Sequence, residues 1–173
     1  MNSSFAIPAV LFLVSLMIRL AYELLKEAHK INAASKPVFI VVFSAMCILW
    51  ASWFSLCPAD PGKLDLPDSI RSIGLAVFIL GTLLAVGALV QLRGVENIDH
   101  LVTTGMFRKI RHPMYVGFIS WLLGWSIYHG GMISLLFSLI GIISVLYWRH
   151  LEEKRLEVQF GDRYQQYRRT TWF

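Results

Sequence analysis

Apolar residues gather in five long stretches of the chain, and short polar segments separate them. The stretches cover residues 5–24, 38–56, 70–92, 114–128 and 132–148. A membrane-spanning helix needs about 20 apolar residues, a length that the first three stretches reach. The fourth is shorter, and only His129-Gly130-Gly131 separates it from the fifth. We therefore expect the last two stretches to form a helical hairpin.

The pattern predicts an all-α polytopic membrane protein with about five transmembrane helices. The first stretch follows Met-Asn-Ser-Ser, without a basic leader, and no small-residue cleavage site follows it, so we interpret it as a retained helix rather than a signal peptide. The length allows one domain over residues 1–173. Residues 1–90 would form a three-helix scaffold, and residues 91–173 a loop, the hairpin and a tail.

Composition agrees with a membrane protein and orients it. The chain is 56% hydrophobic and 16% charged, and its mean hydropathy is +0.58. Soluble domains carry about 25% charged residues. All but two of the sixteen Lys and Arg residues, Lys63 and Arg71, fall on one side of the predicted spans. The positive-inside rule then predicts an external N-terminus and a cytosolic tail, in the plasma membrane if the source is prokaryotic.

The net charge of +5 reflects this bias and attraction to anionic lipid, so a nucleic-acid role is disfavoured. Cys47 and Cys57 lie ten positions apart, about 15 Å along a helix, which is too far for a disulfide. No zinc-ligand pattern, Walker loop or GxGxxG motif occurs.

The first candidate site is the sequence RKIRHP, where four basic or imidazole side chains meet an apolar run. Pro113 is suited to the first position of a helix, so His112-Pro113 predicts where the fourth helix begins. The free N–H groups there could receive an anionic group. Alternatively, Arg108, Lys109 and Arg111 only anchor the protein at lipid headgroups.

The second candidate site is the tail. Helical spacing places Glu152, Leu156, Phe160 and Tyr164 on one face, with Tyr167 near it, in a cytosolic amphipathic helix that Gly161 ends or bends. The acid pair Glu152-Glu153 at the membrane boundary calls for a cation, which could be Arg111, Arg149 or a ligand.

Two motifs together resemble the isoprenylcysteine carboxyl methyltransferase and phospholipid methyltransferase superfamily. They are GxFxxxRHPMYxG from Gly105 and EExxLxxxFGxxY from Glu152. The resemblance covers residues 91–167 and implies S-adenosylmethionine bound at the cytosolic face. The positions that it assigns to the cofactor are Gln91, His100, Leu101, Val102, Phe107, His112, Pro113, Met114, Tyr115 and Glu152.

The acceptor is less defined, since Trp148 stands where the prenylcysteine enzymes have a substrate-contacting arginine. The aromatic lead-in of those enzymes is replaced by LRGVENID, residues 92–99. We expect Arg111, Arg149 and Glu153 to contact the substrate. A prenylcysteine-type carboxylate, a lipid amine and a small thiol all stay open as lipophilic or small acceptors.

Two other functions stay open. Membrane reductases of the sterol reductase type share a similar RHPxY-like hairpin but bind NADPH. The acid pair favours the methyltransferase, as does Met114, where the reductases tend to have Asn. The other possibility is a non-catalytic membrane protein whose basic motif only sets topology.

Overall fold

The computed structural model describes residues 3–32, 35–92 and 100–173, and these fold into helices joined by loops. The elements are α1 (Ser3–Glu27), α2 (Lys36–Leu56), α3 (Asp68–Leu92), η1 (Gly105–Arg108), α4 (Pro113–His129), α5 (Met132–Phe160) and α6 (Asp162–Thr170). Of the described helices, α1, α2, α3 and α5 are long and apolar enough to cross a membrane, and α4, with 17 residues, is shorter. The all-helical membrane fold is thus confirmed.

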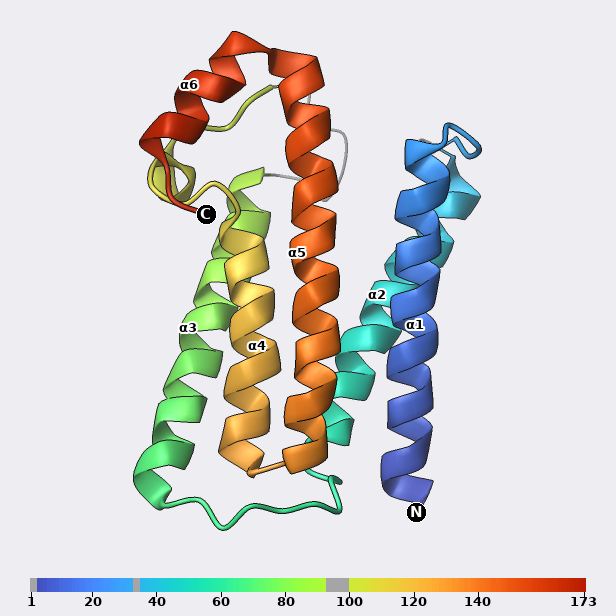
Figure 1. Cartoon of the computed structure of the whole chain (residues 1–173), viewed down its shortest axis with the longest axis vertical. Helices are drawn as coiled ribbons and strands as arrows, with labels where there is room; N and C mark the ends of the chain where they lie inside the picture. The colour runs from blue at the N-terminus through green and yellow to red at the C-terminus, as the bar shows by residue number, and fades with distance from the viewer. Residues whose placement is uncertain (1–2, 33–34, 93–99) are drawn as a thin grey trace.

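Helices α1 to α5 run alternately in opposite directions, as Figure 1 shows. The N-terminus and the α4–α5 turn lie at one end, and η1 and α6 lie at the other. Gly130 makes the turn in the left-handed conformation (φ 61°), which glycine adopts without steric cost. The predicted hairpin is confirmed, because α4 and α5 pack side by side.

Glycines bring α3 and α4 unusually close together. A Cβ atom on Gly117 would lie 2.6 Å from the carbonyl oxygen of Gly81, and one on Gly124 would lie 2.6 Å from the Phe78 backbone nitrogen. Small residues of this kind allow the backbones of membrane helices to approach. The first turns of α4 are therefore held firmly against α3.

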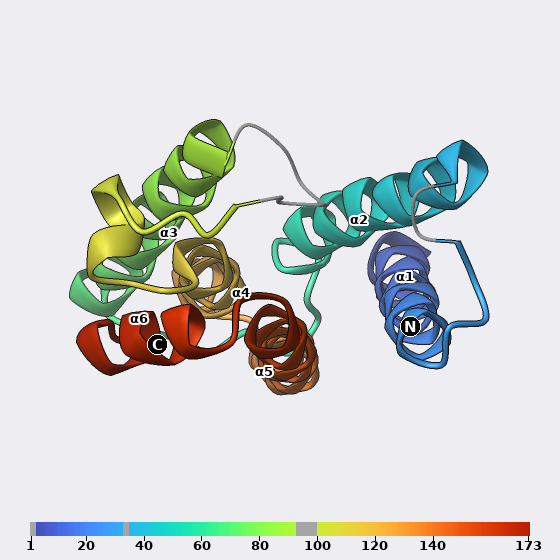
Figure 2. The same cartoon turned by 90° about the horizontal axis from the view of Figure 1, so that it is seen from above.

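The tail differs from the sequence prediction in one respect. Helix α5 continues to Phe160, and Gly161 (φ 53°) ends it, so Tyr164 lies on α6 instead of sharing a helical face with Glu152. The single continuous face is thus wrong beyond Gly161. Figure 2 shows α6 folded back across the end of the bundle. Residues 93–99, which make up nearly all of LRGVENID, lie outside the described residues.

Candidate functional site

A pocket lies at the end of the bundle beneath α6, and we call it the end pocket. All the positions that the family resemblance assigned to the cofactor line it, except Gln91. The pocket has further lining residues that the resemblance did not assign to the cofactor: Leu92, Arg111, Leu156, Tyr164 and Tyr167. Segments far apart in sequence, from the end of α3 to α6, thus build one concave site.

His112 lies at the start of α4, directly before Pro113, where the sequence predicted the helix to begin. Its ring is buried between two acids: Nδ1 lies 3.9 Å from Glu152 Oε2, and Nε2 lies 3.3 Å from Glu153 Oε1. Its backbone N–H donates to the Phe173 carbonyl oxygen at 3.1 Å. His112 therefore links α4 to α5 through its ring and to the segment after α6 through its backbone.

Arg111 forms an ion pair with Glu153, at 3.1 Å between Nη2 and Oε1. Its Nη1 also donates to the carbonyl oxygens of Arg168, at 3.1 Å, and Thr171, at 2.9 Å. Of the cations suggested for the acid pair, Arg111 is the one that pairs with Glu153. These contacts fasten the end of α6 to α5, above the pocket.

Glu152 has a different environment from its neighbour. Its side chain is 34% exposed, while that of Glu153 is 10% exposed. Glu152 lines the end pocket beside Tyr115, with which it interacts electrostatically. Its carboxylate therefore keeps open acceptor capacity toward a ligand.

Tyr164 and Tyr167 form the α6 side of the pocket. The Tyr167 hydroxyl donates to the Phe107 carbonyl oxygen at 2.6 Å. The Tyr164 hydroxyl is buried and has no hydrogen-bond partner among the described residues. Burial raises the pKa of Tyr164 to about 12, so this hydroxyl stays protonated and can donate. A buried polar group without a partner is costly, and a ligand could supply one.

The structure places three of the predicted site residues outside the lining of the end pocket: Gln91, Arg149 and Glu153, of which Glu153 pairs with Arg111. Gln91 holds the loop before α4, because its Nε2 donates to the Thr104 carbonyl oxygen and its Oε1 accepts from the Met106 N–H at 3.1 Å. The Arg149 guanidinium lies 4.5 Å from the centroid of the Phe173 ring.

A second cavity of about 280 Å³, which we call the side cavity, lies between α2, α3 and α4. Most of its lining is aliphatic or aromatic, and it includes Arg19 from α1 and Trp148 from α5. Met114 and Tyr115 line both cavities, so the two meet at the first turn of α4. The side cavity was not predicted from the sequence, because residues 1–90 carry no motif. The sequence signal for it is Arg19, a charge inside an apolar stretch.

Residues from α3 to the start of α6 are similar in sequence to known proteins. Residues 70–163, more than half of the chain, match the phospholipid methyltransferase family. Protein-S-isoprenylcysteine O-methyltransferase of Schizosaccharomyces pombe is 43% identical over an alignment of 82 residues, and the alignment covers 43% of this chain and 32% of that protein. Methanethiol S-methyltransferase of Pseudomonas deceptionensis is 36% identical over 83 residues, covering 47% and 31%.

Protein-S-isoprenylcysteine O-methyltransferase B of Arabidopsis thaliana is 30% identical over an alignment of 113 residues, and the alignment covers 57% of this chain and 55% of that protein. The chain thus spans between about a third and just over half of the length of these relatives. No solved structure matches. The relatives are methyltransferases and give no support to the reductase alternative. The chain therefore belongs to the phospholipid methyltransferase family.

Proposed function

We propose that the protein transfers a methyl group from S-adenosylmethionine to an acceptor within the membrane. The end pocket carries this proposal, because it gathers the residues assigned to the cofactor from four separate segments. The side cavity supports it, since an apolar acceptor could reach the same place from the lipid. Met114 and Tyr115 would then lie where donor and acceptor meet.

The chemistry of the pocket fits S-adenosylmethionine. The Glu152 carboxylate would receive the donor's ammonium group, and a charge-assisted hydrogen bond of this kind is among the stronger polar contacts. The free N–H groups at the start of α4 would receive its carboxylate. The Tyr164 hydroxyl offers another donor. Leu101, Val102 and other apolar lining residues would flank the adenosine.

S-adenosylmethionine supplies an already activated methyl group: the acceptor's lone pair forms the new bond to carbon, and the sulfur keeps the electrons of the bond that breaks. The protein's task is then to position the two reactants and to exclude water. We assign Arg111 and Glu153 to positioning, because their ion pair fastens α6 over the pocket. Arg149 would support the same segment through Phe173.

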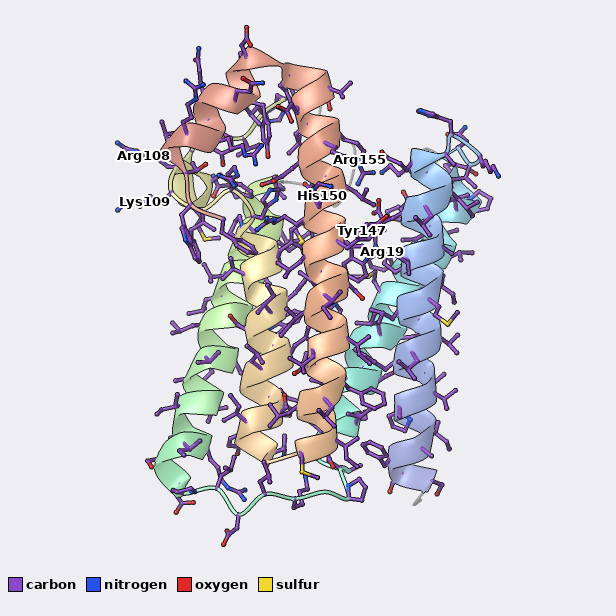
Figure 3. The ribbon with its side chains drawn as sticks, viewed as in Figure 1. Arg19, Arg108, Lys109, Tyr147, His150 and Arg155 are labelled. Atoms are coloured by element: carbon purple, nitrogen blue, oxygen red, sulfur yellow. The ribbon has the colours of Figure 1, made fainter. Side chains whose placement is uncertain are left out.

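The side of the membrane is part of the proposal. The end pocket lies at the end where Arg108, Lys109 and Arg155 also lie, as Figure 3 shows. By the positive-inside rule this end faces the cytosol, where soluble S-adenosylmethionine is available. Amine labelling of intact cells should then reach Lys63 and not Lys109, and the reverse pattern would contradict this orientation.

Binding of labelled S-adenosylmethionine to the purified protein, with NADPH in parallel, tests the proposal. We expect S-adenosylmethionine alone to bind. Glu152→Ala and His112→Ala should each weaken binding at least about tenfold, since each removes a polar group of the pocket. Glu157→Ala, on the same helix, is the control and should bind normally. Unchanged affinity in both site variants, or binding of NADPH instead, would contradict the proposal.

A further inference from the structure

The side cavity opens toward the lipid between α2 and α3. Four of its lining residues on these helices, Phe39, Phe43, Val86 and Leu89, are between 42% and 50% exposed at the surface of the bundle. Among its lining residues, Arg19 carries the formal charge. A guanidinium at the edge of an apolar cavity requires a partner, because an unpaired charge in lipid is costly.

Arg19 has a carboxylate partner within the protein, Glu23, but Arg155 pairs with the same carboxylate. Arg19 pairs with Glu23 one turn further along α1, and the Arg155 Nη2 atom lies 3.0 Å from the other oxygen of the same carboxylate. The Glu23 side chain is 2% exposed. Two guanidinium groups against one carboxylate leave an excess of one positive charge. Figure 3 shows Arg19 and Arg155 at the same end of α1 and α5.

Trp148 adds a neutral donor beside this charge. The Arg19 guanidinium lies 5.1 Å from the centroid of the Trp148 ring, and both residues line the side cavity. The Trp148 side chain is buried, and its indole N–H has no hydrogen-bond acceptor among the described residues. In contrast, the indole groups of Trp121 and Trp125 donate to Thr82 Oγ1 and to the Phe54 carbonyl oxygen. Trp148 is thus a donor without an acceptor.

Tyr115 connects this group to the end pocket. It lines both cavities, and it interacts electrostatically with Glu152 on the one side and with Arg19 and Glu23 on the other. A ligand whose head lies at Arg19 and whose apolar part extends between α2 and α3 would therefore approach the place where the methyl donor is proposed to bind.

We propose that Arg19 holds the anionic head of an apolar methyl acceptor, a carboxylate or a thiolate, in the side cavity. This inference rests on the proposed function and names its substrate class. The anion's lone pair forms the bond to the methyl carbon, and the S–CH₃ electrons stay on sulfur, so an anion and a sulfonium cation become two neutral molecules. An apolar cavity favours such charge cancellation.

The same cavity disfavours an amine acceptor. At neutral pH an alkylamine is an ammonium ion and an alkylthiol is mostly protonated, so each must release a proton to water before it can attack. The thiolate that results is an anion that Arg19 can hold, whereas the amine that results is neutral and gains no such ion pair. The excess positive charge of the Arg19 group would also repel the ammonium ion.

Matched acceptors with one chain length test the inference: decanoate, decanethiol and decylamine, offered with methyl-labelled S-adenosylmethionine to the purified protein. We expect methylation of the carboxylate or the thiol, and the comparison of the two identifies the head group. Decylamine should stay unmethylated. Methylation of decylamine at the rate of the anionic acceptors, or of none of the three, would overturn the inference.

Two variants, one that removes a positive charge and one that removes a negative charge, distinguish a role of Arg19 in acceptor binding from a purely structural role. Arg19→Gln should raise the KM of the anionic acceptor about tenfold or more, because a charged hydrogen-bond donor is lost. Glu23→Gln should lower it, since the positive excess grows. General destabilisation would harm both variants alike, and a KM that both variants leave unchanged would overturn the proposal. Arg108→Gln, an exposed arginine at the same end, is the control.

Two binding measurements complete the experiment. Acceptor binding, followed by the fluorescence of the tryptophans that line the cavity, should weaken in Arg19→Gln without any turnover. The affinity for S-adenosylmethionine should not change in this variant. If the unaltered protein fails to bind S-adenosylmethionine, the proposed function fails. If it binds the donor but Arg19→Gln binds the acceptor normally, only the present inference fails.

Discussion

The two cavities differ in which parts of the chain build them. Every residue that lines the end pocket lies between Leu92 and Tyr167, and nearly all of them fall within the family match over residues 70–163. About half of the side cavity comes from α1 and α2, before that match begins. The end pocket, where we propose that the donor binds, is therefore the part that this chain shares with its family, and the proposed acceptor cavity lies largely outside that part.

Their polar groups differ as well. The end pocket presents the carboxylate of Glu152, the imidazole of His112 and tyrosine hydroxyls, which suit a zwitterionic ligand. The side cavity is apolar apart from a few groups at its edge, which include Arg19. If the proposed roles hold, a polar and an apolar site that meet at one helix start would allow the acceptor to change while the donor site is kept. The isoprenylcysteine and methanethiol in the names of the relatives agree with this view.

The largest effect should come from a change that disrupts both cavities at once. In Gly117→Val, the added Cβ would lie 2.6 Å from the Gly81 carbonyl oxygen and 2.9 Å from the Ala85 backbone nitrogen, and backbone atoms cannot yield easily. We expect a loss of about 1–3 kcal/mol of stability or more, together with loss of donor and acceptor binding. Thermal unfolding in detergent measures it.

Gly87→Ala is the matched control on α3, because its Cβ would meet only the flexible end of Met106, at 3.0 Å. This variant should unfold near the temperature of the unaltered protein. Equal unfolding temperatures for both variants would show that the close α3–α4 approach does not hold the cavities together.

A change confined to the side cavity should have a smaller effect and should distinguish the roles of the two cavities. Val86 lines the side cavity and is half exposed, so Val86→Trp can narrow the cavity without disturbing the core. We expect kcat/KM for a ten-carbon acceptor to fall about tenfold, and that for a methyl-sized acceptor to change less, because steric exclusion grows with size. The affinity for S-adenosylmethionine should stay constant. Val90→Trp, one turn away at an exposed position outside the cavity, is the control.

The smallest effect should come from single hydroxyl groups of the end pocket. Tyr164→Phe removes a hydroxyl that lacks a partner among the described residues, so the protein should stay as stable while S-adenosylmethionine binds a few times more weakly. Tyr167→Phe removes the bond to the Phe107 carbonyl oxygen and should cost about 1 kcal/mol of stability. Calorimetry measures both quantities, and the opposite assignment of the two effects would contradict the role given to Tyr164.

Much of the fold follows from the sequence, since hydrophobic length and helix-start chemistry are local properties. The expected stretches agree with α1 to α4 within a few residues at each end, and Pro113 begins α4 as its fixed backbone angle predicts. The first part of the tail also agreed, because Glu152 and Leu156 share a helical face and line the same pocket. These predictions depended on neighbours in sequence.

The parts that were missed depend on contacts between distant segments. Tyr164 reaches the end pocket because the chain reverses at Gly161, and spacing along a straight helix could not show that. Arg19 was counted as a charge that sets topology, since only the packing of α1 against α5 places it beside Trp148. Gln91 lies outside the pocket because it holds the loop before α4.

The unbroken length of α5 ties the site to the thickness of the bilayer. At 1.5 Å per residue, the step from Met132 to Glu152 is about 30 Å, close to the hydrocarbon thickness of a typical membrane. Hydrophobic mismatch would then act directly on the end of the molecule where we propose that the donor binds. In lipids with longer acyl chains, Glu152 would be drawn toward the hydrocarbon, and its affinity for a charged donor would fall. The same enzyme could therefore work at different rates in membranes that differ only in acyl-chain length.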